Sequence, residues 1–254
     1  MQLRSGNSLC WIGATYLMLW PTSVLAEPLI DPICSHALRH EGKLQQGSNT
    51  TLFRIADDEQ AYKLEGIRVL KRLDLSSNAQ IFVSDDEPAD RYGRKPAQVI
   101  YEGKWLQQSL LEDGRALVFG NTGLNDCYRI LLGFEAVARS SLKGVWQKAQ
   151  FGLKARHPKR MLEYEGKLIV ASGKVLSVGD RSRRLYLNFG KNWSQDFTVS
   201  VVKSGKGAFK GGNLVDLADL QSLAGREVLV RGMLENRKGP LIRLYHGSQI
   251  QIME

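Results

Sequence analysis

The turn "DRYGR" at residues 90–94 contains residue types that could bind a phosphate. Arg94 stands directly before a hydrophobic run, and Gly93 gives the preceding turn backbone freedom that other residues lack. A guanidinium held there could grip a phosphate through two parallel hydrogen bonds. Arg94 could equally be an ordinary exposed turn arginine, which is the commoner case. The motif therefore defines a candidate site only if partner residues exist.

Other candidate binding residues lie in the C-terminal half. Tyr186, Phe189, Trp193 and Phe197 could stack on bases, although alternating strand positions place most of them in a core. Trp193 lies among polar residues and is the best stacking candidate. The segment "SGKGAFKGG" (204–212) could cradle a phosphate, but it lacks the Walker spacing and fits a flexible hairpin loop better. The sequence suggests no Ser-His-Asp catalytic set.

Residues 1–26 have the pattern of a secretory signal peptide. Arg4 supplies positive charge, residues 9–20 form a short apolar core, and the small residues Val24 and Ala26 fit a cleavage site. An uncleaved membrane anchor is the alternative, although the apolar core is short for a bilayer. We expect cleavage after Ala26 and export to a periplasm or to the outside of the cell.

Export would place the cysteines in an oxidising compartment, where disulfides form. Cys10 is removed with the signal peptide, which leaves Cys34 and Cys127 as a pair that predicts a disulfide in an oxidising compartment. The bond would close a loop of 127 − 34 = 93 residues and contribute about 4 kcal/mol in the loop-entropy model. The alternative is a metal site formed by Cys34, His36 and His40, which requires a helix and lacks an evident fourth ligand.

Length and charge predict two domains. About 228 residues (254 − 26) remain after signal removal. Residues 27–150 carry 16 Lys+Arg against 17 Asp+Glu, whereas residues 151–254 carry 18 against 9. Nearly all of the net charge of +9 therefore belongs to the C-terminal part. Such a domain attracts polyanions, although a basic domain without any partner is the alternative.

Hydrophobic patterns predict a small barrel with helices over residues 34–149. A hairpin and two further strands come first, and two helices follow with Gly114 and Gly144 at their ends. The predicted strands are 51–56, 61–70, 79–84 and 97–102, and the predicted helices are 104–113 and 125–142.

Residues 150–160 are basic and lack periodicity, which predicts a linker. Residues 161–254 then give three strands, broken at Gly173 and at the 179–184 turn, a helix at 214–223 and two final strands. This is the chain order of an OB-type barrel. The whole chain is predicted to be mainly β with α (α+β): an OB-type β-barrel with C-terminal helices, then a second small OB-like β-barrel.

Three stretches of the first domain resemble the staphylococcal-nuclease-like, or thermonuclease, family over residues 47–147. They are "AYKLEGI" (61–67), "DRYGRKPAQVIYEGKWLQQSLLEDGRALV" (90–118) and "CYRILLGFEAVARSSLKGVW" (127–146). The second domain looks like an extension found on some exported bacterial members.

The resemblance implies a site. Members that cut nucleic acid hold Ca²⁺ with aspartates, activate water with a glutamate and stabilise the phosphate with two arginines. Arg94 matches one arginine, and Lys63 stands for the other, keeping the charge but losing the bidentate fork. Arg68 falls near the position of a metal aspartate, and Lys71 near that of the glutamate.

The carboxylates that this chemistry needs are missing from the matching positions. No acid lies between Gly66 and Leu73, and the earlier signature falls on "GSNTTL" (47–52), where Asn49, Thr50 and Thr51 offer no carboxylate. Ca²⁺ needs hard anionic oxygens, so we expect no bound cofactor. Lys63, Arg68, Lys71 and Arg94 would instead form an anion-binding cleft, with solvated surface charges as the alternative.

The resulting hypothesis is an exported, catalytically degenerate protein, a pseudoenzyme, that binds nucleic acid or another anionic polymer. A second hypothesis is an active metal-dependent nuclease with acids from Asp57, Asp58 or residues 85–87. A third is an envelope scaffold that binds protein or cell wall. Neither the polymer nor the oligomeric state follows from the sequence.

Overall fold

The structure is a computed structural model, and it describes residues 37–47, 50, 52–56, 59–83, 88–120, 125–192, 194–205, 209–210 and 215–253. The predicted signal peptide, Cys34, Trp193, Asp57, Asp58 and residues 85–87 lie outside this part. Residues 31–254 form one compact unit. Within the described residues, no helix is long and apolar enough to cross a membrane.

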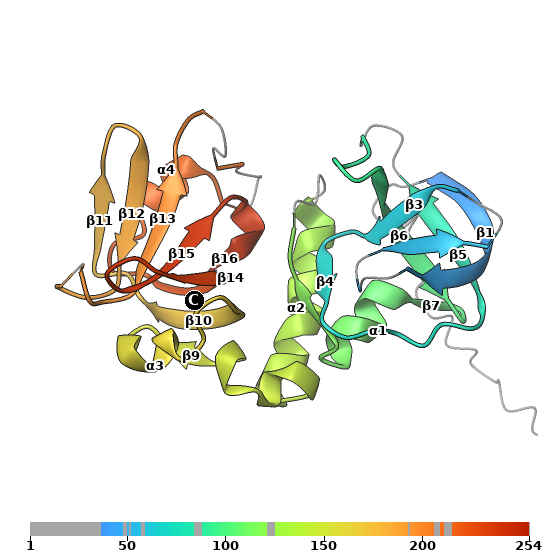
Figure 1. Cartoon of the computed structure of the whole chain (residues 1–254), viewed down its shortest axis with the longest axis horizontal. Helices are drawn as coiled ribbons and strands as arrows, with labels where there is room; N and C mark the ends of the chain where they lie inside the picture. The colour runs from blue at the N-terminus through green and yellow to red at the C-terminus, as the bar shows by residue number, and fades with distance from the viewer. Residues whose placement is uncertain are drawn as a thin grey trace, which may run out of the picture. The chain divides into compact units, whose positions relative to one another are not determined.

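The first sheet closes into a barrel of five strands (Figure 1). Its order is β3-β2-β1-β5-β6, and the parallel pairing of β3 with β6 joins the two ends. Alternate residues of β5, such as Ile81 and Val83, point into the core, as a strand with one buried face requires. The strands are β1 (Ala37–Gln46), β2 (Phe53–Ile55), β3 (Ala61–Leu64), β5 (Asn78–Val83) and β6 (Arg94–Tyr101), and β7 (Lys104–Trp105) pairs with β6.

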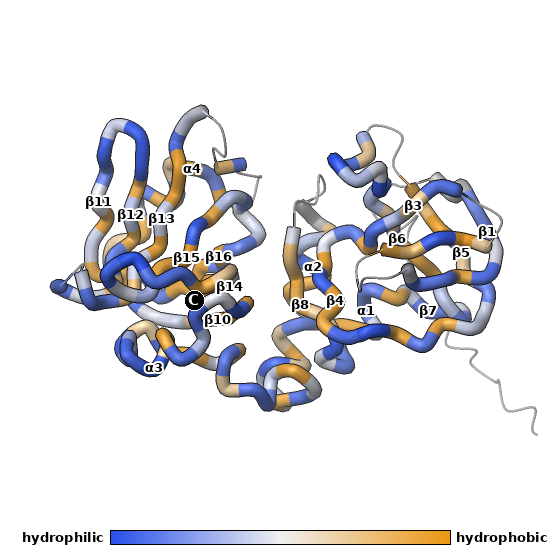
Figure 2. The backbone as a smooth tube through the Cα atoms, viewed as in Figure 1, coloured by the Kyte–Doolittle hydropathy of each residue, from blue (hydrophilic) through white to orange (hydrophobic). Residues whose placement is uncertain are grey.

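Two helices and a two-stranded ribbon pack on this barrel. The ribbon pairs β4 (Ile67–Val69) with β8 (Ala116–Val118). All three β8 residues are buried, and the hydropathy colours of Figure 2 show that they are apolar. The helices are α1 (Leu106–Glu112) and α2 (Asn125–Ser140), close to the predicted ranges. Gly114 follows α1 with φ of 60°, the left-handed conformation in which glycine ends helices.

The second sheet curls into a half-barrel. Its path is β11-β12-β13-β15-β14-β10-β9, with β16 also paired to β14. β11, at one end of this path, follows β10, the last strand but one at the other end, after only residues 175–176. The strands are β9 (Leu153–Lys154), β10 (Leu168–Lys174), β11 (Ser177–Asp180), β12 (Arg184–Asn188), β13 (Thr198–Val202), β14 (Glu227–Asn236), β15 (Pro240–Leu244) and β16 (Ile250–Met253), and the helices are α3 (Pro158–Leu162) and α4 (Leu217–Gln221). The mainly β fold class is confirmed, and the break predicted at Gly173 lies two residues later.

Residues 150–160 are packed chain rather than a free linker. Phe151 and Leu153 are buried, and β9 pairs in parallel with β10. A core cluster here combines residues from both sides of the predicted linker: Leu117, Ala138, Val145, Trp146, Phe151, Leu168, Val170 and Leu229. The linker prediction missed this because isolated buried positions between basic residues show no periodicity.

A buried ion pair lies in the same region. Arg231 of β14 donates to a carboxylate oxygen of Glu135 on α2 at 2.7 Å and to the carbonyl of Val118 at 2.7 Å. Both charged side chains have 0% exposure. The backbone N–H of Val118 donates to the same Glu135 oxygen at 2.7 Å. The barrel residues and the second sheet are therefore joined by buried polar contacts as well as by a shared core.

Candidate anion-binding site

Two neighbouring parallel strands bring the predicted cations together. In the β3–β6 pairing, Ala61 lies opposite Arg94 and Lys63 opposite Pro96. The chain then turns through Gly66, which has φ of 74°, and enters β4 with Arg68. Because β4 is held by β8, the Arg68 side chain is fixed next to Phe119, with its guanidinium carbon 5.5 Å from the ring centroid.

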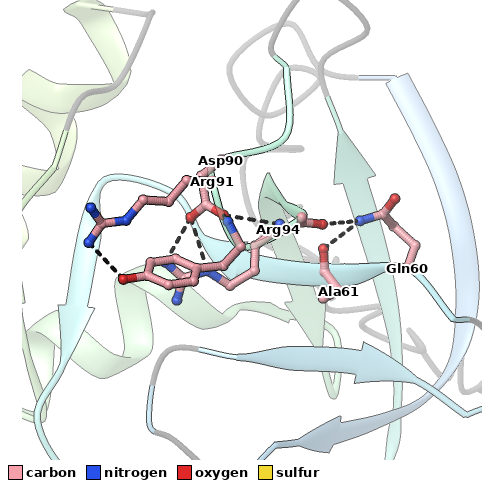
Figure 3. Close-up of polar contacts among 7 residues, drawn as sticks. Gln60, Ala61, Asp90, Arg91 and Arg94 are labelled. Atoms are coloured by element: carbon pink, nitrogen blue, oxygen red, sulfur yellow. Dashed lines mark hydrogen bonds and ion pairs between the residues drawn. The ribbon is translucent and has the colours of Figure 1, made fainter.

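The 90–94 turn fixes Arg94 at the start of β6 (Figure 3). Its guanidinium donates to one Asp90 carboxylate oxygen at 2.7 and 3.0 Å, and the other oxygen accepts from the backbone of Tyr92 and Arg94. The amide of Gln60 donates to the carbonyl of Gly93 at 2.8 Å and so holds the turn against β3. Burial favours a higher pKa for Asp90, but the hydrogen bonds from Arg94 and the turn outweigh it and lower the pKa.

Tyr92 contacts two guanidiniums. Its ring centroid is 4.7 Å from the guanidinium carbon of Arg91 and 5.1 Å from that of Arg94, and 63% of Tyr92 is exposed. Arg91 also donates to the Tyr92 hydroxyl at 2.6 Å. This stack orders two arginines and an aromatic face at the same edge of the barrel, through cation–π contacts.

Tyr92 and the cationic residues described above line one pocket of about 630 Å³. Its cationic side chains are Lys63, Arg68, Arg91 and Arg94. Lys71 is exposed and does not line the pocket, because β4 ends at Val69 and the following bend leaves the ribbon. Three of the four predicted anion-binding cations on this barrel therefore come together, and the fourth lies apart.

The sequence prediction missed an acid in this pocket. Glu65 lines the pocket, is 2% exposed and accepts a hydrogen bond from the amide of Gln98 at 3.0 Å. The amide oxygen of Gln98 in turn accepts from the indole N–H of Trp105 at 2.9 Å. Glu65 follows Lys63 by two residues, and this period of two at the end of a strand was the available signal.

His246, which follows β15 of the second sheet, lies close enough to Lys63 for the lysine charge to affect its pKa. Burial, then Lys210 and Lys63, lower the pKa of His246 below its usual value. His246 also forms an isolated parallel bridge with Lys210. Lys210 therefore extends the positive charge beyond the barrel, and the lowered pKa favours the neutral form of His246.

The pocket does not fit a calcium ion. Ca²⁺ takes six to eight oxygen ligands, whereas the pocket lining offers one carboxylate, Glu65, beside four cations. Across the described residues, His, Cys, Asp and Glu side chains form no group of three that could hold a metal. His40, from the alternative metal prediction, lies in strand β1 rather than in a helix.

The aromatic candidates of the second sheet separate by burial. Phe197 is core, and Phe189 packs on it with ring centroids 4.8 Å apart. Tyr186 is half-buried and lines a second pocket.

Comparison with protein families now assigns the barrel. Residues 43–148 match the model described as "Staphylococcal nuclease homologue". This part of the chain is a staphylococcal nuclease-like domain. No curated protein matches the chain. The match agrees with the predicted resemblance and supports a nuclease-like or nucleic-acid-binding function for the nuclease-like domain.

Proposed function

We propose that the protein is a catalytically degenerate member of this family that binds nucleic acid through the pocket of Lys63, Arg68, Arg91 and Arg94. The observation that carries the proposal is the charge of the pocket lining, four cations with one carboxylate. Guanidiniums bind phosphate bidentately, and Lys adds a point charge. Single-stranded nucleic acid fits best, because Tyr92 offers an exposed ring for a base beside the phosphate-binding arginines.

Hydrolysis needs a base or metal beside the attacking water. Arg68 supplies positive charge at the matched position of a metal aspartate, and a cation there repels Ca²⁺. Glu65 is the single carboxylate of the pocket lining, and its bond from Gln98 holds it in the barrel wall. We expect binding without turnover.

The test combines binding and cleavage with single-stranded DNA and RNA. Wild type should bind with a strong salt dependence, and Arg94→Ala should weaken binding about tenfold, which equals about 1.4 kcal/mol. The log–log salt slope should also fall by about 0.7, the share of one phosphate contact on a single strand. Arg54→Ala is the matched control, because Arg54 is exposed on β2 and outside the pocket lining.

No Ca²⁺-dependent cleavage should exceed that of a vector-only preparation. Cleavage that Glu65→Gln abolishes would revive the nuclease alternative, with Glu65 as the base. Salt-insensitive binding, or equal losses in Arg94→Ala and Arg54→Ala, would refute the pocket as the nucleic-acid site and favour a protein-binding scaffold.

We also propose that the chain is exported after cleavage behind Ala26 and that Cys34 pairs with Cys127. Cys127 is buried at the start of α2, so a bond to it would fasten the N-terminal segment to the helix. Denatured, unreduced protein from a periplasm should show no titratable thiol, and mass spectrometry should find Glu27 first. Two titratable thiols would disprove the disulfide.

A further inference from the structure

A second pocket, of about 470 Å³, lies on the outer face of the C-terminal sheet. Its volume is in the ~300–1,000 Å³ range of small-molecule sites. Neighbouring strands build its floor: Gly179 of β11 pairs with Tyr186 of β12, and Asn188 of β12 pairs with Thr198 of β13. The intervening Leu187 points into the core, so the polar side chains share the outer face.

The floor of this pocket contains a buried threonine hydroxyl without a hydrogen-bond partner among the described residues. This residue is Thr198, which is 8% exposed. An unsatisfied buried hydroxyl costs free energy, so a ligand that bonds to it recovers that cost. Beside it, the Asn188 amide donates to Ser177 at 3.2 Å, which fixes its orientation.

A glycine lies opposite the tyrosine on the neighbouring strand. An added side-chain carbon at Gly179 would lie 3.8 Å from Cβ of Tyr186 and from the Asn188 amide nitrogen, in ordinary contact. Gly179 therefore leaves open the space that any larger residue would fill. Tyr186 is half-buried and so held at its base, with room beside its ring for a flat group.

Charged groups form the rim. Arg237 comes from the β14–β15 hairpin and is paired with Glu235 at 3.1 Å, and Arg181 comes from the turn after β11. Asp196 accepts from the backbone of Asn192 at 2.8 Å. Gly239 of the β14–β15 hairpin lies close to the segment between β12 and β13. An added side-chain carbon at Gly239 would be 3.2 Å from the Asp196 carbonyl oxygen, so the missing side chain allows the close approach.

We infer that this pocket binds one nucleotide of a single-stranded nucleic acid. Tyr186 stacks on the base, Asn188 and Thr198 bond to the edge of the base, and Arg181 and Arg237 contact the flanking phosphates. A neutral sugar would use the hydroxyl and amide but not two guanidiniums, and the excess of 18 Lys+Arg over 9 Asp+Glu in residues 151–254 favours a polyanion. The inference rests on the proposed nucleic-acid binding and adds a second, base-reading site to it.

The test compares a labelled thymidine oligonucleotide with an abasic strand of equal length, bound to the full mature chain at fixed salt. Wild type should bind the base-bearing strand about fivefold or more tightly, the scale of stacking one base. Tyr186→Leu should lower this preference about fivefold, leaving the part that Tyr92 supplies, and Tyr186→Phe should keep it. Arg237→Ala tests the rim of the pocket, and Arg226→Ala is its control for the loss of one charge. Arg226 is exposed and lies outside the pocket lining.

Gly179→Val is a second test that keeps Tyr186 in place. Valine suits a strand and would fill the space beside the ring, so the preference for bases should also fall about fivefold with an unchanged melting temperature. A lower preference in both Tyr186→Leu and Gly179→Val supports the site.

The two proposals fail separately. If Arg94→Ala weakens binding while Tyr186→Leu and Gly179→Val leave the base preference intact, the second site is refuted and the barrel pocket stands. If Arg94→Ala has no effect while Tyr186→Leu removes the preference, the barrel pocket is refuted and the second site stands. Heparin binding that depends on Tyr186 would overturn base recognition.

Discussion

Arg68 places a positive charge in the lining of the barrel pocket. It lies on a strand fixed by β8, and Phe119 holds its guanidinium at 5.5 Å. Such a contact contributes about 0.5–1 kcal/mol where exposed and more where desolvated. The positive charge is therefore ordered in the pocket, as the proposed phosphate binding requires.

At the same scale, His246 should report occupation of the pocket. Its pKa is lowered by burial, by Lys210 and by Lys63, so the folded protein takes up its proton less readily than the unfolded chain. The free energy of unfolding should fall as the pH drops from about 6.5, the unfolded value, to the folded pKa, because the unfolded state binds more protons there.

NMR titration of the imidazole should show this lowered pKa. Lys63→Gln should raise it by removing a nearby positive charge, and a bound oligonucleotide should raise it too. Lys104→Gln serves as a control, because Lys104 does not contribute to the shift. An unchanged pKa in Lys63→Gln would contradict the proximity of the two residues.

At the scale of elements, the ends of α1 and α2 meet at a contact that only glycine permits. The backbone N–H after Gly144 donates to the carbonyl of Gly114 at 2.8 Å, and both glycines have φ near 60°. A side-chain carbon at Gly114 would overlap the Lys143 carbonyl, and one at Gly144 would overlap the Gly114 carbonyl. This contact sets where β8 and the segment after α2 can pack.

Gly144→Ala should therefore destabilise the protein by more than about 1 kcal/mol, because it adds both conformational strain and a clash with backbone. Gly133→Ala is the matched control. Gly133 is exposed inside α2 with nothing within 4 Å of an added carbon, so alanine should stabilise by about 0.5–1 kcal/mol. Urea unfolding measures both, and similar signs for the two variants would disprove the close-approach argument.

At the scale of the whole molecule, the buried pair of Arg231 and Glu135 links the nuclease-like domain to the second sheet. Removing one partner leaves an uncompensated buried charge, which costs about 3–5 kcal/mol. The shared core cluster adds apolar contacts that the family match, residues 43–148, does not contain by itself.

Arg231→Met should lower the free energy of unfolding by about 3–5 kcal/mol, and adding Glu135→Gln should recover part of the loss. Lys143→Met is the control: its pair with Asp113 is about half exposed on both sides, so the change should stay within about 1 kcal/mol. Tryptophan fluorescence during urea unfolding should show one transition. A loss below 1 kcal/mol, or separate transitions, would show that the two sheets unfold independently.

Much of the fold was predictable because its signals are local. The β2–β3 hairpin, the strands β5 and β6, and the helices α1 and α2 follow from alternation, helical spacing and the glycines at 114 and 144. β1 was missed, because its sequence alternates poorly and ends among polar residues. β8 was missed because its three buried residues are too few for a period.

The sequence by itself identified the nuclease-like domain and three cations that share its pocket, since these depend on motifs within short stretches. Tertiary structure alone showed that Lys71 lies outside the pocket and that Glu65 lines it. It also brought together Glu135 and Arg231, which lie 96 residues apart. Such contacts depend on how distant elements pack, and no local periodicity records that packing.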